Sequence, residues 1–144
     1  MSLFPNRNAM RPKILIFLIA ILTLTACSFR EAKDPKFRED KDILLNELRS
    51  LRNFENARVK WDARTFENKI IDVLVVELVN GQGMVDDEAE LRKLGQEAIK
   101  LAVAAIDNES EYERMEVIFI RESRRGVLTN NFTRSFQYAP EDFN

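Results

Sequence analysis

Two segments of the chain carry apolar residues at the spacing of amphipathic helices. The repeating apolar positions are Phe37, Leu44, Leu48 and Leu51 in the first segment, and Leu91, Leu94, Ala98, Leu101, Ala102, Ala105 and Ile106 in the second. Asp34 followed by Pro35 is typical of a helix start, so we predict a first helix over residues 35–53. Asp87 and Glu90 have the spacing of a capping box and predict the start of a second helix of about twenty residues.

Four other segments have the apolar pattern of β-strands. They are residues 57–66, 70–79, 115–120 and a last segment in which Leu128, Phe132, Phe136 and Tyr138 share one side. Turn residues at 66–69 and 123–126 predict that these strands pair as two hairpins. The order of elements is therefore αββαββ, which predicts an α+β fold: an antiparallel sheet of about four strands with helices packed on it. We expect this to be a single domain over residues 35–144.

The segment 70–79 is apolar on both of the sides that a strand presents. Its apolar residues are Ile70, Leu74, Val76 and Leu78 on one side, and Ile71, Val73, Val75 and Val79 on the other. A strand of an antiparallel sheet with one face in water should alternate apolar and polar residues instead. Something must cover the second face, and two alternatives are open. One is the first helix, or helices on opposite sides of a central strand; the other is a second copy of the chain or another protein.

The beginning of the chain has the pattern of a secretory signal. Arg11 and Lys13 precede an unbroken apolar run over residues 14–22. A helix needs roughly 20 apolar residues to span a bilayer, and this run is much shorter. The pattern therefore predicts a signal peptide. Met10 is an alternative start that would leave a shorter but complete signal.

The end of this signal resembles the lipobox of bacterial lipoproteins. The matching residues are Leu24-Thr25-Ala26-Cys27. The resemblance implies that the Cys27 thiol receives a diacylglyceryl group and that the chain is cut just before it. Residues 1–26 would then be the signal peptide, and residues 27–34 a lipidated cysteine with a polar tether. Two acyl chains anchor a protein stably, whereas one gives marginal binding. An ordinary signal peptide with a cysteine near its cut, or a short uncleaved anchor, are the alternatives.

The same resemblance bears on the compartment. Ser28 follows the cysteine and does not look like the aspartate that signals inner-membrane retention in enteric bacteria. We therefore expect a protein of the cell envelope that is lipid-anchored to a membrane, with the outer membrane favoured if the host is Gram-negative.

Residue counts exclude several classes of function. The chain has no histidine and one cysteine, which rules out a Ser-His-Asp triad, a His-ligated metal and an intramolecular disulfide. Removal of residues 1–26 takes away three of the 22 basic residues and none of the 24 acidic ones, so the net charge becomes about −5. Such a domain is a poor candidate for nucleic-acid binding. We expect no cofactor and no metal.

Three groups of side chains are candidate sites. The first is a cluster of arginines at the second predicted turn, which could contact lipid phosphates or an acidic partner: Arg121, Arg124 and Arg125. The second is a set of aromatic residues that could line a groove for a sugar or peptide, or else belong to the core: Trp61, Phe132, Phe136 and Tyr138. The third is an acidic group that we expect to cap the second helix: Asp86, Asp87, Glu88 and Glu90. None of these groups is a catalytic constellation. The sequence therefore favours a non-enzymatic lipoprotein that acts through protein contacts or self-association. The alternative is a lipoprotein that binds a sugar, a peptide or a lipid fragment.

Overall fold

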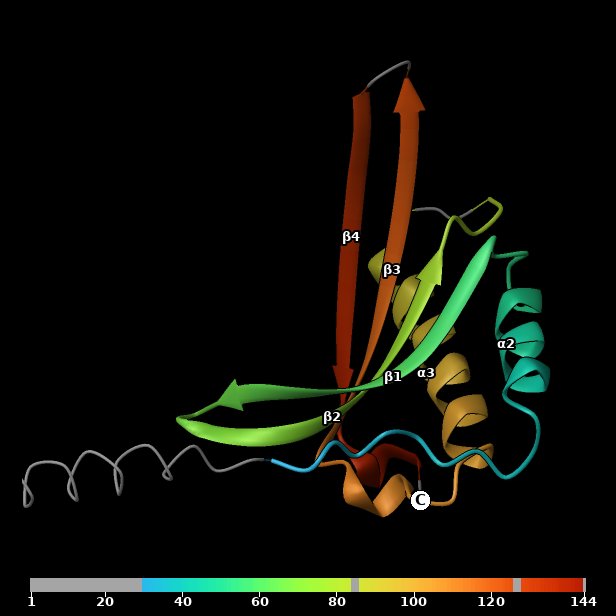
Figure 1. Cartoon of the computed structure of the whole chain (residues 1–144). Helices are drawn as coiled ribbons and strands as arrows, with labels where there is room; N and C mark the ends of the chain where they lie inside the picture. Colours follow the sequence, from blue (N-terminus) through green and yellow to red (C-terminus); the bar gives the residue numbers. More distant parts are fainter. Residues whose placement is uncertain (1–29, 84–85, 126–127, 144) are drawn as a thin grey trace, which may run out of the picture. The chain divides into compact units, whose positions relative to one another are not determined.

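Four strands form one mixed sheet, and two helices pack on it (Figure 1). The computed structural model describes residues 30–83, 86–125 and 128–143, and the fold belongs to the unit formed by residues 32–144. In chain order the elements are α2 (Lys41–Ser50), β1 (Asn56–Phe66), β2 (Lys69–Val79), α3 (Glu88–Ala104), a 3₁₀ turn (Glu109–Glu111), β3 (Arg114–Arg125), β4 (Leu128–Tyr138) and a second 3₁₀ turn (Pro140–Phe143). The α+β class and the order αββαββ are confirmed.

The sheet is mixed because its two central strands run in parallel. The strand order is β1-β2-β3-β4, with two antiparallel hairpins, β1–β2 and β3–β4. Between them β2 and β3 pair in parallel, with Val73 opposite Arg114 and Val79 opposite Ile120. Helix α3 makes this possible, since it carries the chain back to the end of the sheet where β2 began. The expectation of a purely antiparallel sheet is corrected on this point.

Both hairpins lie close to where the sequence predicts them. Glu67 and Asn68 connect β1 to β2 with φ angles of 47° and 64°, and positive φ at both central residues is the type I′ geometry that suits a two-residue hairpin. The second turn comes later than predicted. Strand β3 continues to Arg125, which pairs with Leu128, so only residues 126–127, outside the described residues, connect β3 to β4.

The first helix is shorter than predicted. It begins at Lys41, and its N-cap is Asp40, whose side chain accepts a hydrogen bond from the Asp42 N–H at 3.0 Å. The predicted start at Pro35 is wrong because the preceding backbone is used elsewhere: Phe37 forms a β-bridge with Ile106. The second helix starts as predicted.

The acidic residues before α3 fix the beginning of that helix. Asp87 is its N-cap and accepts a hydrogen bond from the Glu90 N–H at 3.0 Å, so the predicted capping role of Asp87 is confirmed. Asp86 instead forms an ion pair with Arg134 of β4, at 3.2 Å. Glu90 pairs with Arg52, which follows α2.

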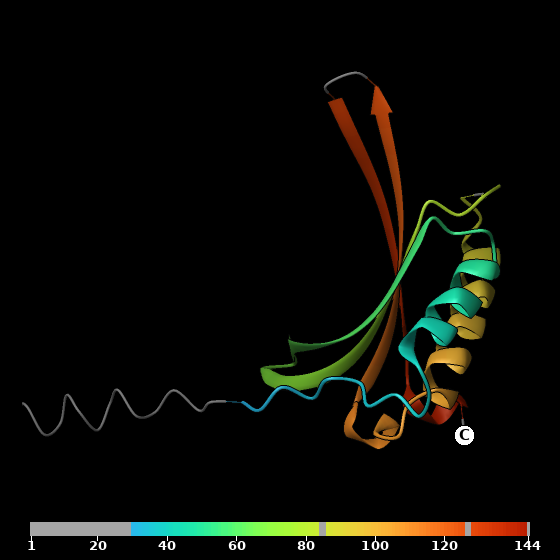
Figure 2. The same ribbon diagram turned by 45° about the vertical axis from the view of Figure 1, so that its right-hand side comes forward.

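Helices α2 and α3 lie on the same side of the sheet and form the core with it (Figure 2). Leu74, Val76 and Leu78 of β2 face this core and are fully buried. Tyr138 approaches α3 so closely that a Cβ at Gly95 would collide with its hydroxyl oxygen. Only glycine fits there, although glycine is otherwise unfavourable inside a helix.

The opposite side of β2 is covered by charged side chains of this chain. Val73 and Val75 point away from the helices, yet they are 3% and 0% exposed. Lys60 of β1 forms an ion pair with Glu77 at 2.5 Å, and Arg64 of β1 pairs with Glu116 of β3 across the face. The aliphatic stems of such side chains cover apolar surface while their charged ends meet.

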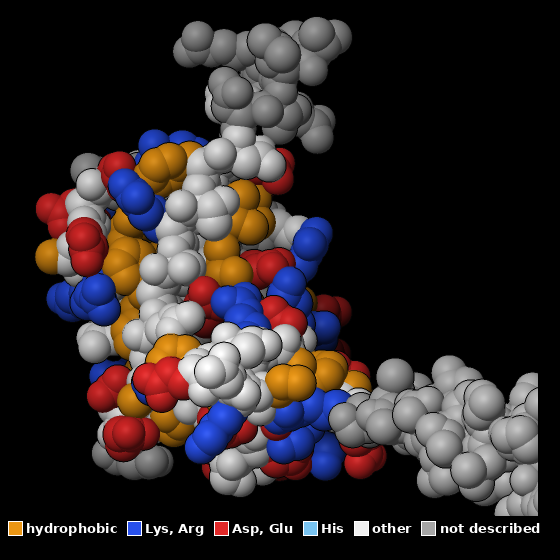
Figure 3. Space-filling view, turned by 90° about the vertical axis from the view of Figure 1, so that its left-hand side faces the viewer, with side chains coloured by type: hydrophobic (Ala, Val, Ile, Leu, Met, Phe, Trp, Pro, Cys, Tyr) orange, Lys and Arg blue, Asp and Glu red, His pale blue; other side chains and the backbone are white. Residues whose placement is uncertain are grey.

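Figure 3 views the molecule from the side opposite the helices, where basic and acidic side chains are intermixed. The second face of β2 therefore needs neither a helix nor a partner to close it. Within the described ranges, no helix has the length and apolar character required to cross a membrane.

Candidate functional site

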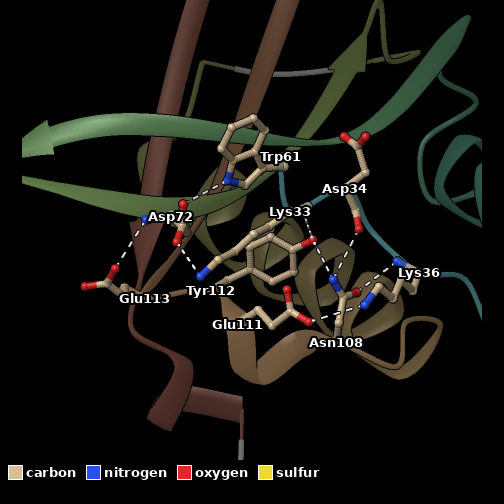
Figure 4. A network of polar contacts seen from close by, with 9 residues as sticks. All are labelled: Lys33, Asp34, Lys36, Trp61, Asp72, Asn108, Glu111, Tyr112 and Glu113. Carbon is tan, nitrogen blue, oxygen red and sulfur yellow. Dashed lines mark hydrogen bonds and ion pairs between the residues drawn. The ribbon is translucent and has the colours of Figure 1, made fainter. Parts of the chain in front are cut away.

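A polar cluster around Asp72 of β2 joins the start of the domain to the sheet (Figure 4). The Asp72 side chain is 1% exposed. Its Oδ1 accepts a hydrogen bond from Trp61 Nε1 at 3.0 Å, and its Oδ2 forms an ion pair with Lys33 Nζ at 2.7 Å. A buried carboxylate is costly unless it is paired and hydrogen-bonded. The ion pair with the buried Asp72 carboxylate therefore holds Lys33 in position.

Two side chains after α3 hold the backbone next to Lys33. The Tyr112 hydroxyl donates a hydrogen bond to the carbonyl oxygen of Lys33 at 2.6 Å. The Asn108 amide donates to the carbonyl oxygen of Asp34 at 3.2 Å and accepts from the Lys36 N–H at 2.8 Å. Asn108 is buried, and these contacts satisfy its amide group.

Backbone pairing continues the attachment up to Arg38. The Arg38 N–H donates to the carbonyl oxygen of Ala105 at 2.9 Å, and the Asp107 N–H donates to that of Lys36 at 2.8 Å. We call residues 33–38 the anchored segment, and Asp72, Trp61, Asn108 and Tyr112 the clamp. The anchored segment overlaps the end of the predicted tether, so six residue steps separate Cys27 from the first clamped residue, Lys33. Cys27 itself and the signal residues lie outside the described residues.

Burial changes the acidity of both tyrosines. Removal from water raises the pKa of Tyr112 to about 12, the Asn108 hydrogen bond opposes this rise, and the nearby carboxylates of Glu111, Asp34 and Asp72 add to it. Burial likewise raises the pKa of Tyr138 to about 12, against a lowering influence of Arg92. Both phenols are neutral donors at ordinary pH, as their hydrogen bonds to carbonyl oxygens require.

The aromatic residues predicted to line a groove are not brought together. Trp61 is half-buried, and its N–H is used by Asp72. Tyr138 is 4% exposed, and its hydroxyl donates to the carbonyl oxygen of Arg92 at 2.8 Å. Phe136 is buried in the core, whereas Phe132 is exposed near the end of the β3–β4 hairpin. These four rings do not line one groove, and the binding of a sugar or peptide by them stays a prediction.

The β3–β4 hairpin carries the predicted arginines beyond the core. Arg121 lies over the Phe132 ring, 5.8 Å from its centre, and Arg134 lies over the same ring at 4.7 Å. Arg134 is in turn held by Asp86. Arg124 and Arg125 belong to strand β3 rather than to a turn, and their side chains lie outside the described residues.

An apolar groove lies beside the two helices. It has a volume of about 240 Å³ and is lined mainly by α2, α3 and the anchored segment, with Phe37, Ile43 and Leu101 among its apolar residues. Pockets for drug-sized ligands are usually larger, about 300–1,000 Å³. In the part of the chain that the structure describes, no group of acidic or cysteine side chains is arranged to hold a metal ion.

Sequence reasoning missed most of the clamp. Asp72 carried a signal, because it is the one charged residue in the otherwise apolar stretch Ile70–Val76 and had to find a partner once buried. Lys33, Asn108 and Tyr112 carried none, since they lie in polar segments that resemble ordinary loops.

Comparisons with known proteins add nothing to these observations: no protein-family model, no curated protein and no solved structure matches the chain.

Removal of the buried carboxylate should release the anchored segment. We expect Asp72→Ala to lower the free energy of unfolding by about 3 kcal/mol, because Lys33 and the Trp61 N–H lose their partner. Urea denaturation followed by fluorescence of Trp61, the only tryptophan, measures this change. Glu97→Ala, at an exposed position on α3, is the control. An Asp72→Ala variant as stable as the wild type would contradict the role of the clamp.

Alkaline pH should weaken the domain through its two tyrosines. Below pH 10 both states hold both phenolic protons; between about 10 and 12 the unfolded chain loses them while the folded one keeps them. The free energy of unfolding should therefore fall by about 1.4 kcal/mol per pH unit for each tyrosine. The variant with both Tyr112→Phe and Tyr138→Phe should lose less stability over this range in urea titrations. Equal slopes for the two proteins would refute the effect.

Proposed function

We propose that this chain is a lipid-anchored lipoprotein of the cell envelope, and that its domain acts without catalysis by presenting the β3–β4 hairpin to a protein partner. The observation that carries the proposal is the lipobox-like sequence ending at Cys27, followed so closely by the anchored segment. An acylated Cys27 would hold the chain at a membrane, and the clamp would hold the domain to the chain.

The geometry of the anchored segment supports a domain kept near the membrane. Six residue steps from Cys27 to Lys33 extend at most about 21 Å, at roughly 3.5 Å each. From Lys33 onward the chain is fixed by the Asp72 ion pair and the Tyr112 hydrogen bond. A long flexible linker would let the domain move far from its anchor, whereas this short connection keeps Lys33 within about 21 Å of Cys27.

The state of the buried carboxylates supports a role without catalysis. A general acid or base needs a carboxyl group within reach of a substrate. Asp72 is enclosed by Lys33 and Trp61. Glu116 is 3% exposed and paired with Arg64. Both groups are used in holding the fold together.

The exposed end of the β3–β4 hairpin supports a protein contact. Phe132 is 36% exposed and lies between two arginines, Arg121 and Arg134. Aromatic side chains and arginine are enriched in protein interfaces and among the residues that carry most of the binding energy. The Asp86 ion pair fixes Arg134 before any partner arrives, which reduces the entropy lost on binding.

Loss of the cysteine should abolish anchoring. We expect Cys27→Ala to leave the precursor uncleaved or to release the protein from membranes, because no thiol remains for acylation. Membrane fractionation and mass spectrometry of the purified protein measure both outcomes. Ser28→Ala changes the neighbouring residue and should fractionate as the wild type. If Cys27→Ala fractionated and ran like the wild type, the anchoring proposal would fail.

Truncation of the hairpin aromatic should weaken the partner contact. We expect Phe132→Ser to reduce the protein that is crosslinked to the full-length chain in membranes by tenfold or more, since a central interface side chain contributes about 2 kcal/mol. Ile43→Ser is the matched control, because Ile43 is 48% exposed but lies on α2. Equal recovery of the crosslinked protein with both variants would exclude Phe132 from the contact.

A further inference from the structure

Three of the four large apolar side chains that are exposed among the described residues lie at opposite ends of the sheet, and the fourth, Ile43, lies on α2. Among the residues whose exposure the structure describes, four large hydrophobic side chains are exposed: Ile43, Phe66, Ile70 and Phe132. Phe66 and Ile70 flank the turn of the β1–β2 hairpin, at 40% and 57% exposure. Phe132 is near the far end of the other hairpin.

The parallel pairing of β2 with β3 sets these two ends apart. Val73 lies opposite Arg114, and Phe132 lies opposite Arg121, seven residues further along β3. That offset places Phe132 roughly 23 Å along the sheet from the level of Val73. Ile70 lies three residues from Val73 in the opposite direction along β2. The two hairpins accordingly extend in different directions (Figure 1).

The anchored segment enters the domain at the β1–β2 end. Lys33 contacts Asp72. Ile70 is two residues from Asp72 on the same strand and on the same side of the sheet, so roughly 7 Å separates residue 70 from residue 72. The lipid on Cys27 would lie within about 21 Å of Lys33. Of the two hairpin ends, the one carrying Phe66 and Ile70 is therefore the end next to the lipid.

We infer that the tip of the β1–β2 hairpin inserts Phe66 and Ile70 into the membrane interface beside the lipid anchor. The inference rests on the proposed function and adds the orientation of the domain. The lipid bilayer is the occupant that the chain length favours, because six residue steps keep Lys33, which contacts the strand of this tip, within about 21 Å of the lipid. The β3–β4 hairpin then points away from the membrane, where a partner can reach it.

Charge at the tip is balanced, so apolar contact carries the insertion. Glu67 and Lys69 are both exposed beside the turn and offset one another. Arg114 lies over the Phe66 ring, 5.4 Å from its centre, and can extend toward lipid phosphates while its stem covers the ring. Aromatic and basic side chains are characteristic of the interfacial layer of membrane proteins.

The test uses the full-length lipidated protein and a single fluorescent label. Ile70→Cys, Ile43→Cys and Phe132→Cys each introduce one reactive thiol at an exposed position, since Cys27 is the only natural cysteine and is blocked by its acylation. The labelled proteins are reconstituted into vesicles of phosphatidylethanolamine and phosphatidylglycerol that contain a lipid with a quencher on its headgroup. Flotation of the vesicles shows whether each protein is anchored.

Insertion predicts selective quenching at one position. Interfacial segments lie about 5–10 Å into the boundary between headgroups and acyl chains, so the label at residue 70 should be quenched about threefold more strongly than the labels at 43 and 132. Equal quenching at the three positions of floating protein would overturn the inference while the anchoring stands. A label at 70 that is shielded from a water-soluble quencher but not quenched by the lipid would overturn it in favour of a second copy or another protein. Protein that does not float with the vesicles would overturn the proposed anchoring and the inference together.

Discussion

The parallel pairing of β2 with β3 is the constraint from which the arrangement of this protein follows. Each of these strands is also one arm of an antiparallel hairpin, and the parallel pairing extends only from Val73 to Val79 on β2. The rest of each hairpin has to project beyond the shared region. The two hairpins project at opposite ends because one turn precedes β2 and the other follows β3, and the two strands run in the same direction. A sheet of two antiparallel hairpins joined antiparallel would have placed both turns at one end. The fold therefore has two separate tips, with the clamp near one of them.

The clamp makes this separation of tips relevant to function. A buried carboxylate in an apolar strand requires a cation, and Lys33, at the start of the anchored segment, supplies it. The same contact that neutralises Asp72 therefore fixes where the chain enters the domain. A hydrophobic residue at position 72 could stabilise the sheet as well or better, since buried ion pairs are rarely the most stable solution. What the Lys33–Asp72 ion pair contributes is the position of the anchored segment, which it attaches to one end of the sheet and not to the other.

The sequence predicts the elements of this fold better than their connections. Alternation and helical spacing identify both helices and all four strands, and Asn68 and Asp87 mark a turn and a cap correctly. Asp34-Pro35 is as good a helix start as Asp40 by local rules, and only the pairing of the anchored segment with residues 105–107 decides between them. The direction of β3 relative to β2 depends on the path of α3, which no local pattern records. The clamp was missed for the same reason, because Asn108 and Tyr112 contact residues of the anchored segment that are 74 and 79 positions away in the chain.

The covering of β2 differs from both alternatives that the sequence left open, a helix or a partner. Its two apolar sides do require cover, as the alternation rule states, but long charged side chains on β1 and β3 supply it. Lys60, Arg64 and Glu116 look like an ordinary solvated face in the sequence, and it is their pairing across three strands that turns them into a lid over Val73 and Val75. A bare sheet face would have made association through β2 the natural proposal. With that face closed, the exposed large apolar side chains among the residues whose burial is described lie at the two hairpin ends and on α2. The hairpin ends differ in chemistry: Phe132 is contacted by two arginines, whereas Phe66 is contacted by one, Arg114, and has the exposed Ile70 beside it at a turn whose charges balance. That difference is the physical ground for assigning a protein to the first and a membrane to the second.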